Sequence, residues 1–227
     1  MIPIGVLASS GSPWAGLPAV TYGGVIGINA TSDNKSSYSA NPTLGDYEDG
    51  RVILISAMTN GTDANTTCTV GGVSATKIAT VESTTDDHAT HLWYYNGTLS
   101  GTQTVTVSIS GGANYINMNV IKIISPYSDT PFAYDTALGQ EAISTAVDLV
   151  PEGAFAFYQF ARRNSSSVGV TYSGTTGSVV TIDSGDFNNS NDYRRRSYVI
   201  ATSEGSGDYT TDSFTSPDGY AIMAVFR

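Results

Sequence analysis

Short runs of apolar residues, separated by Gly, Asn and Asp, recur along this chain of 227 residues. In Gln103–Ser110 apolar and polar residues alternate, which places Val105 and Val107 on one face. Alternation with a period of two is typical of a β-strand that has one buried face. Arg51–Met58 and Tyr220–Phe226 are more continuously apolar runs. Almost no helical periodicity is present, so the pattern predicts an all-β fold.

Turn residues bound the predicted strands. Gly71-Gly72, Asn96-Gly97 and Gly111-Gly112 each interrupt or end an apolar run, and such pairs favour tight turns. The predicted strands cover 51–58, 68–70, 73–81, 92–95, 103–110, 116–124, 154–160, 168–172, 178–182, 197–202, 209–214 and 220–226. Their number and spacing predict an antiparallel β-sandwich.

The two halves of the chain match each other at an offset of 103 or 104 residues. Gly50–Ile55 lines up with Gly153–Tyr158, and Ile116–Ile123 lines up with Tyr220–Arg227. A four-strand unit used twice fits two Greek keys that form one sandwich over 46–227, with duplicated halves 46–125 and 151–227. Two small tandem sandwiches are the alternative. We favour one sandwich, because 125–152 contains three prolines and has the character of a long, irregular crossover.

Residues 1–45 differ from the remainder in composition. They combine Gly, Ser, Pro and Asn with short apolar stretches. Two interpretations stay open: an arm that orders only against a neighbouring subunit, or a first strand followed by a loop.

Charge and cysteine content narrow the range of functions. The formal net charge is −10, which disfavours binding to nucleic acid and to anionic membranes. The single cysteine, Cys68, allows no internal disulfide and is expected to be a buried strand residue. No apolar stretch approaches the roughly 20 residues of a spanning helix, and the first residues do not have the features of a signal peptide. Synthesis and assembly in a cytoplasm are therefore expected.

Several motifs follow one another in a recurrent order. An Arg-led apolar strand at Gly50–Ile55 precedes a T-V-G-G-V-x-A-T hairpin at Thr69–Thr76, and an L-W-Y strand begins at Leu92. A G-T-x-T-V-T-V strand begins at Gly101, and an apolar strand ending in Phe-Arg closes the chain at Ala221–Arg227. This order resembles structural proteins of tailed-phage virions and of gene-transfer-agent-like particles. Over 46–227 the resemblance implies a jelly-roll-like sandwich with a structural or attachment role and no catalytic residues.

The sequence offers few candidates for chemistry. A P-loop, a G-x-S-x-G nucleophile elbow and a G-x-G-x-x-G loop are all absent. Asp86-Asp87-His88 with His91 could supply ligands to a divalent ion, although a solvated loop is the simpler interpretation. Asp183–Asp192 is rich in oxygen ligands but lacks the spacing of an EF-hand. We expect no catalytic, cofactor or metal residues, and leave open whether a calcium ion is bound.

Two groups of residues are candidates for contacts with other molecules. Arg194, Arg195 and Arg196 stand together in an acidic chain, and could pair with an acidic surface of a neighbouring copy or of a capsid. Trp93 and Tyr95 could stack on sugar rings, although strand alternation also favours core packing.

The favoured hypothesis is a non-enzymatic virion protein: a head decoration or spike, or a tail or fibre component. It would pack against other virion proteins and form a homo-oligomer. We expect it to be made in the host cytoplasm and to reside in the virion, with no nucleic-acid or membrane partner. The alternative is an attachment module that binds glycans on the host surface.

Overall fold

The structure is a computed structural model. It describes residues 12–31, 34–60, 65–83, 88–113, 116–139, 143–163, 170–173, 177–186, 192–201, 204–211 and 219–227. Across these ranges the regular structure consists of β-strands, whose ladders are antiparallel. None of the described segments forms a helix able to cross a membrane. The predicted all-β, antiparallel fold is confirmed.

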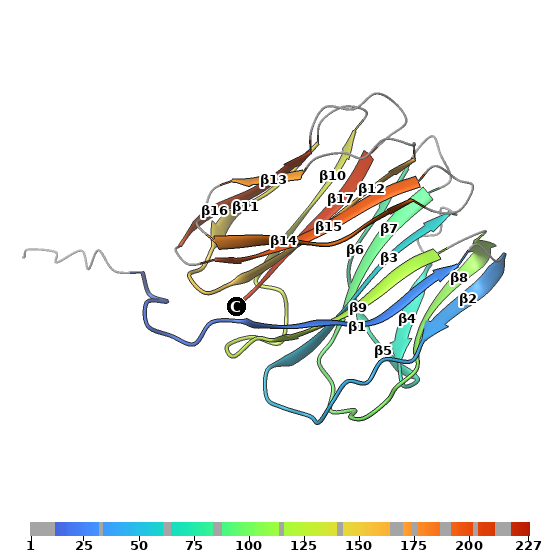
Figure 1. Ribbon diagram of the computed structural model, residues 1–227, viewed down its shortest axis with the longest axis horizontal. Coiled ribbons are helices and arrows are strands. Elements are labelled where there is room, and N and C mark those ends of the chain that lie inside the picture. The colour runs from blue at the N-terminus through green and yellow to red at the C-terminus, as the bar shows by residue number, and fades with distance from the viewer. Residues whose placement is uncertain are drawn as a thin grey trace, which may run out of the picture.

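The first half of the chain forms two sheets (Figure 1). Its inner sheet contains, in spatial order, β1 (Thr21–Thr31), β9 (Ile116–Ile124), β3 (Arg51–Asn60), β7 (His88–Tyr95) and β6 (Thr76–Glu82). Its outer sheet contains β2 (Lys35–Ala40), β8 (Val105–Ala113), β4 (Thr67–Val70) and β5 (Val73–Ser74).

The second half repeats this arrangement. Its inner sheet contains β10 (Ala133–Gly139), β17 (Gly219–Phe226), β12 (Phe155–Arg163), β15 (Asp192–Ala201) and β14 (Gly177–Asp186). Its outer sheet contains β11 (Ser144–Val150), β16 (Gly205–Thr211) and β13 (Val170–Ser173). Strand for strand the order is that of the first half, with β5 lacking a counterpart among the described residues.

The register of the paired strands repeats at the offset found in the sequence. Ser56 of β3 pairs with Asn119 of β9, and Gln159 of β12 pairs with Ile222 of β17. Both positions in the second pair lie 103 residues after their counterparts in the first. Gly50 and Gly153, which precede β3 and β12 at the same offset, have positive φ angles of 76° and 75°. Glycine is favoured there because other residues are strained in the left-handed region.

The sheets stack as four layers with three hydrophobic cores between them. One core joins the inner and outer sheets of the first half, and another joins those of the second half. The third lies between the two inner sheets, and contains Leu54 and Ile121 from the first half with Phe157 and Ile222 from the second. Each inner sheet is therefore covered on both faces. This explains why β3 and β17 are buried at nearly every position, whereas β8 alternates between buried and more exposed residues over most of its length.

The core between the inner sheets has a polar centre. Gln159 lies opposite Ser56, the residue at the equivalent position in the first half. Its Nε2 donates to the carbonyl of Ala57 at 3.0 Å and to Oγ1 of Thr90, while its Oε1 accepts a hydrogen bond from Ser56 Oγ. Gln159 and Ser56 are both buried. Because an unpaired buried amide is costly, this network favours one alignment of the two sandwiches.

The structure corrects the expectation of one sandwich with an irregular crossover. Residues 125–152 contain β10 and β11, so each half has its own pair of sheets. Residues 1–45 include β1 and β2, which are the equivalent pair in the first half. Within the same range Val20 enters the central core, and its N–H donates to the carbonyl of Gly153 at 2.8 Å. The segment before β1 therefore contacts the second sandwich.

A buried arginine occupies the same place in each sandwich, but on different strands. Arg51 begins β3 and pairs with Ile124 of β9, whereas Arg227 directly follows Phe226, the last residue of β17. Arg51 donates to the carbonyls of Asp46 at 3.2 Å, Gly97 at 2.9 Å and Leu99. Arg227 donates to the carbonyl of Pro18.

Aromatic rings complete both arginine sites. The Arg51 guanidinium lies 5.3 Å from the centre of the Tyr47 ring. The Arg227 guanidinium lies 5.4 Å from that of Trp14 and 4.9 Å from that of Tyr127. Burial lowers the pKa of Arg227, and the charges of Tyr127 and Glu152 oppose this effect. The two arginines join loops at the same end of each sandwich to its inner sheet.

Candidate functional site

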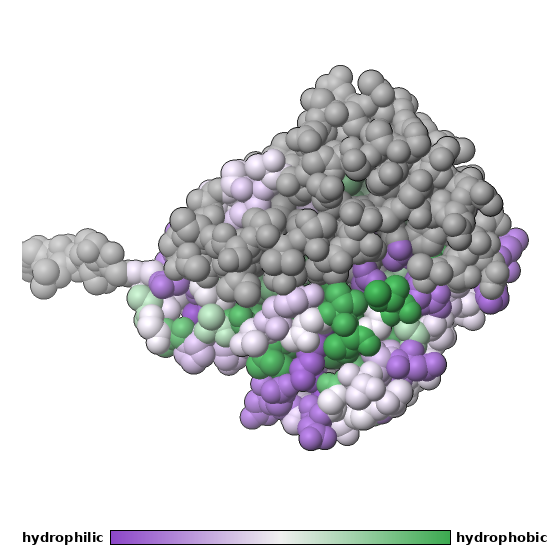
Figure 2. All heavy atoms as spheres, viewed as in Figure 1, coloured by the Kyte–Doolittle hydropathy of each residue, from purple (hydrophilic) through white to green (hydrophobic). Residues whose placement is uncertain are grey.

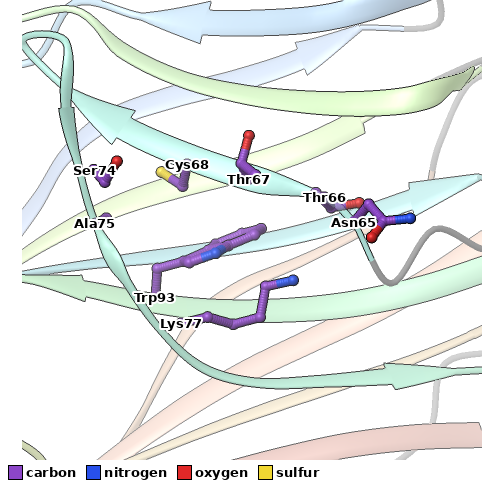
Figure 3. A pocket seen from close by; sticks show the side chains of 8 residues that line it. All are labelled: Asn65, Thr66, Thr67, Cys68, Ser74, Ala75, Lys77 and Trp93. Carbon is purple, nitrogen blue, oxygen red and sulfur yellow. The ribbon is translucent and has the colours of Figure 1, made fainter.

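A hollow of about 410 Å³ lies at the corner where the chain passes from the outer to the inner sheet of the first half (Figure 3). Asn65, Thr66 and Thr67 approach it from the start of β4. Ser74 approaches it from the end of β5, and Ala75 from the connection between β5 and β6. The volume is near the lower end of the range for small-molecule sites.

The remaining lining side chains are Cys68, Lys77 and Trp93. The Lys77 ammonium lies 5.9 Å from the centre of the Trp93 ring, within cation–π range, and Figure 3 shows the two side chains next to each other. Burial raises the pKa of the Cys68 thiol to about 12, so the thiol is protonated at neutral pH. The hollow therefore presents hydroxyl groups, an amide, a cation and an indole ring.

His91 supports Trp93 from within the core. The two rings stack with centres 5.3 Å apart and an interplanar angle of 22°. The ring nitrogens of His91 lie 3.1 Å from Thr59 Oγ1 and 3.0 Å from Thr80 Oγ1. Hydrogen bonds on both nitrogens fix the orientation of the imidazole, and through it that of the indole.

These contacts correct the interpretation of the histidines as part of a solvated loop. His88 and His91 belong to β7 and are buried, with exposed fractions of 3% and 0%. Asp86 and Asp87 lie outside the described residues. Within the described part of the chain, no group of three or more His, Cys, Asp or Glu side chains is placed to hold a metal ion.

The sugar-stacking candidates are core residues. Trp93 is 1% exposed and Tyr95 is 5% exposed, and both belong to the core between the sheets of the first half. An exposed platform of these two rings is therefore not formed, because the outer sheet covers this face of β7. Trp93 nevertheless is one of the residues that line the hollow, next to Lys77.

A stripe of exposed apolar side chains follows β10. Phe132, Tyr134 and Leu138 are 41%, 58% and 44% exposed and alternate with half-buried residues. Ala133 and Ala137, on the opposite face, pack against the core of the second sandwich. We call Tyr127, Phe132, Tyr134 and Leu138 the β10 stripe. The sequence signal was the alternation of 132, 134 and 138, which the interpretation of 125–152 as irregular concealed.

Trp14 extends the β10 stripe at its beginning. Its ring makes edge-to-face contacts with Tyr127 and Phe132, with centres 6.4 Å and 6.1 Å apart. Leu17, three residues further on, is 41% exposed. Five of the eight large exposed hydrophobic residues in the described part of the chain thus belong to the stripe or to this neighbouring segment.

The equivalent edge of the first sandwich is different. Figure 2 shows hydrophobic side chains over β1, among polar ones. Ile28 is 65% exposed, but Tyr22 and Val25 are half-buried against the central core. The Tyr22 ring stacks on that of Phe155 in the second sandwich at 5.9 Å. Glycines at 23, 24 and 27 and two irregularities in register interrupt this edge strand.

Two candidates remain, on β15 and at the end of β14, and the turn before β3 also contains acidic residues. Arg194, Arg195 and Arg196 are consecutive in β15, paired with Ala161, Phe160 and Gln159 of β12; their side chains lie outside the described part of the structure. In the calcium candidate, 183–186 end β14 and 187–191 are not described. In the turn at 45–50, Glu48 forms an ion pair with Lys122 at 2.6 Å and Asp46 binds Arg51 through its carbonyl.

Comparison with known proteins gives no match: no protein-family model, curated protein or solved structure is similar to this chain. The functional argument therefore rests on the β10 stripe and the architecture that positions it.

Proposed function

We propose that this protein is a structural subunit of a particle, of the kind found in tailed-phage virions. We propose further that it acts by packing against copies of itself through the β10 stripe. The single observation that carries this proposal is the stripe. It places several large apolar side chains in solvent on one face of an edge strand, in a molecule whose three cores are otherwise filled.

The size of the stripe favours an interface. With Leu17 it exposes roughly 400 Å² of side chain, if each residue buries 150–250 Å² when fully covered. The largest apolar patch on a typical monomer is roughly 300–600 Å² and is often functional. A standard interface covers roughly 800 Å² on each partner. The stripe can therefore supply the apolar centre of such a contact, and polar neighbours its rim.

Charge favours a second copy as the occupant. Two copies of a chain with a net charge of −10 repel each other over most of their surface. The exposed side chains of β10 are Tyr134, Thr136 and Leu138, all uncharged, while Asp135 points the other way and accepts a hydrogen bond from the N–H of Ala146 at 2.8 Å. A two-fold contact brings the same patch of both copies together. An uncharged patch is what such a contact requires here.

The architecture supports the class of particle. Within each half the chain crosses between the two sheets at most connections, which is compatible with the jelly-roll type. Jelly-roll sandwiches are common in viral capsid and lectin domains. This is an argument from fold, which hosts many functions; the order of sequence motifs, which resembles that of phage virion proteins, adds to it.

Introducing a charge into the stripe tests self-association. Light scattering after gel filtration should show the unmodified chain as a dimer or larger species. Tyr134→Glu should be monomeric, because a carboxylate would be buried in the contact. Ile28→Glu is the matched control: it adds the same charge to an exposed apolar residue on the equivalent edge strand, and should behave as the unmodified chain. A monomeric unmodified chain, or equal masses for all three proteins, would contradict the proposal.

Membership of a virion needs a separate test. Cryo-electron microscopy of purified particles should show the four-layer block at symmetric positions on the head or tail. Absence of the chain from the particles would reject the virion role and leave the self-association result standing. The contact of Arg194, Arg195 and Arg196 with an acidic neighbour stays a prediction, which the same reconstruction would examine.

A further inference from the structure

The two inner sheets have four edge strands, β1 and β6 in the first half and β10 and β14 in the second. The ladder of β1 contains two shifts in register, and those of β6 and β14 contain one each. Such irregularities bend or twist an edge strand and oppose its pairing with a further strand. β10 instead pairs with β17 without a shift from Ala133 to Gly139 (Figure 1). It is therefore the regular edge among the four.

The residues of β10 do not protect this edge either. Lysine and proline, which commonly block the edges of sheets, are absent from its sequence. Its one charged residue is Asp135, whose carboxylate lies toward β11 and accepts a hydrogen bond from the N–H of Ala146. On the opposite face Tyr134, Thr136 and Leu138 are exposed and uncharged. Among the described residues no strand pairs with the other side of β10, where an edge strand presents a row of backbone N–H and C=O groups.

Symmetry defines how a second copy can pair with this edge. Two β10 strands related by a two-fold axis perpendicular to the sheet run antiparallel, and each face of the strand stays on its own side. Opposite residues must share a face, so one residue of β10 has to lie opposite itself. With the axis at Thr136, the middle of the strand, all seven residues of 133–139 pair. With the axis one residue to either side, two residues of each strand stay unpaired.

The cross-strand contacts also favour this register. Tyr134 lies opposite Leu138 of the second copy, so the large apolar side chains of the two stripes contact each other. Thr136 lies opposite its own copy, and such Thr–Thr pairs can form hydrogen bonds. Asp135 lies opposite Ala137. An axis at Asp135 would instead place two carboxylates opposite each other, which is destabilising.

From these observations we infer that two copies join edge to edge through β10, with Thr136 on the two-fold axis. Their two five-stranded sheets then form one sheet of ten strands. Backbone hydrogen bonds hold the two edges together, and the side chains of Tyr134 and Leu138 set the register. The inference rests on the proposed self-association and adds the mode of contact, which is strand pairing rather than stacking of apolar faces.

Single cysteines test the position of the axis, in a Cys68→Ala background that removes the chain's own thiol. Directly opposite residues of antiparallel strands have Cα atoms roughly 4.5–5.5 Å apart, which is within the roughly 4.4–6.8 Å that a disulfide spans. Thr136→Cys should therefore form a disulfide-linked dimer with oxidised glutathione, visible on a non-reducing gel. Leu138→Cys is the matched control on the same exposed face. Its two copies would be roughly 13 Å apart along the strands, and the linked dimer should not form.

Charges at the axis provide a second test that does not depend on cysteine chemistry. Thr136→Lys and Thr136→Glu should each be monomeric, because each places two like charges opposite one another. Mixed in equal amounts they should form a dimer, with twice the mass in light scattering, because opposite charges then meet. Leu138→Lys and Leu138→Glu should stay monomeric when mixed, because residue 138 lies opposite Tyr134. Far-UV circular dichroism of each variant first establishes that it is folded.

Two results would overturn the strand pairing: a linked dimer of Leu138→Cys that forms as fast as that of Thr136→Cys, or a mixture of folded Thr136→Lys and Thr136→Glu that stays monomeric. If the unmodified chain is then still a dimer and Tyr134→Glu a monomer, the proposed self-association stands and only the mode of contact is wrong. A monomeric unmodified chain would reject both.

Discussion

The two sandwiches share strand order and register, but the residue that attaches a loop to the inner sheet differs between them. At one end of each sandwich an arginine side chain attaches a loop to the inner sheet. The two arginines occupy equivalent ends of neighbouring, paired strands. The first sandwich uses Arg51 on β3, and the second uses Arg227 after β17. The comparison teaches that a guanidinium can join loop and sheet at this position from either of two paired strands.

The outer edges of the two inner sheets differ more than their centres. In β1 the apolar side chains Tyr22 and Val25 lie against the other sandwich, whereas in β10 Tyr134 and Leu138 face solvent. An exposed apolar edge strand is a liability in a free monomer. The difference is the reason why we propose β10, rather than β1, as the edge at which copies of the chain pack.

Substitution of the two arginines, one at a time, should give the largest change in the free energy of unfolding and the clearest difference between the two sandwiches. Arg51→Met should lower the free energy of unfolding by about 4 kcal/mol, because three carbonyls lose a charged donor. Arg227→Met should cost less, about 2 kcal/mol, because it removes one such hydrogen bond and two of its nitrogens have no partner in the described structure. Urea denaturation measures both values. Equal losses would contradict this account, because they would show that the two arginines contribute equally to the free energy of unfolding.

The equivalent glycines provide a sharper test with identical substitutions. A Cβ at Gly50 would collide with the carbonyl oxygen of Ser125, whereas one at Gly153 would lie 3.1 Å from Ala19. Gly50→Ala should cost about 3 kcal/mol, and Gly153→Ala about 1–2 kcal/mol, because both share the left-handed backbone but one adds a backbone collision. Thermal and urea unfolding would give these values. A larger loss at Gly153 would contradict the packing at both turns.

Gln159 tests how the sandwiches are joined. Gln159→Leu should lower the free energy of unfolding by about 2 kcal/mol, because Ser56, Thr90 and the Ala57 carbonyl lose their buried partner. Ser56→Ala should cost about 1 kcal/mol, since Gln159 keeps its other contacts. A double-mutant cycle would detect coupling between the two positions. Strictly additive effects would argue against a shared network.

A further prediction, of a pH-dependent effect, concerns the buried thiol of the first sandwich. Burial raises the pKa of Cys68 from 9.0 to about 12, so the unfolded chain ionises first as the pH rises. The resulting contribution to stability is complete below pH 9 and is lost progressively between pH 9 and 12. By pH 10 the unmodified chain should have lost about 1.4 kcal/mol relative to Cys68→Ala, compared with their difference at pH 7. If the difference in stability between the unmodified chain and Cys68→Ala did not change with pH, the thiol would be exposed to water in the folded protein.

The sequence predicted the central strands of both halves, left a first strand open in 1–45 and predicted no strand in 125–152, where β10 and β11 lie. The apolar runs that became β3, β9, β12 and β17 were recognised because strands covered on both faces carry a strong signal. The glycines of β1 and the polar alternation of β10 weaken that signal, as edge strands are only partly buried. The offset of 103 residues was recognised, but the sequence pattern did not reveal that each half had enough strands for its own sandwich.

The candidate site was less predictable, because its parts are distant in sequence. Trp93 was singled out, but its partners Lys77 and Thr66 carry no motif. The burial of His91 depends on Thr59 and Thr80, which come from the neighbouring strands β3 and β6. Pairing of strands decides such contacts, and a single sequence gives pairing only through its turns.

Hydrogen–deuterium exchange measured at low and high protein concentration tests the central claim most directly. If copies pack through the β10 stripe, amides of residues 132–138 should exchange more slowly at high concentration, while those of β1 should not change. Protection of β10 that does not depend on concentration, or protection of β1 instead, would contradict the account.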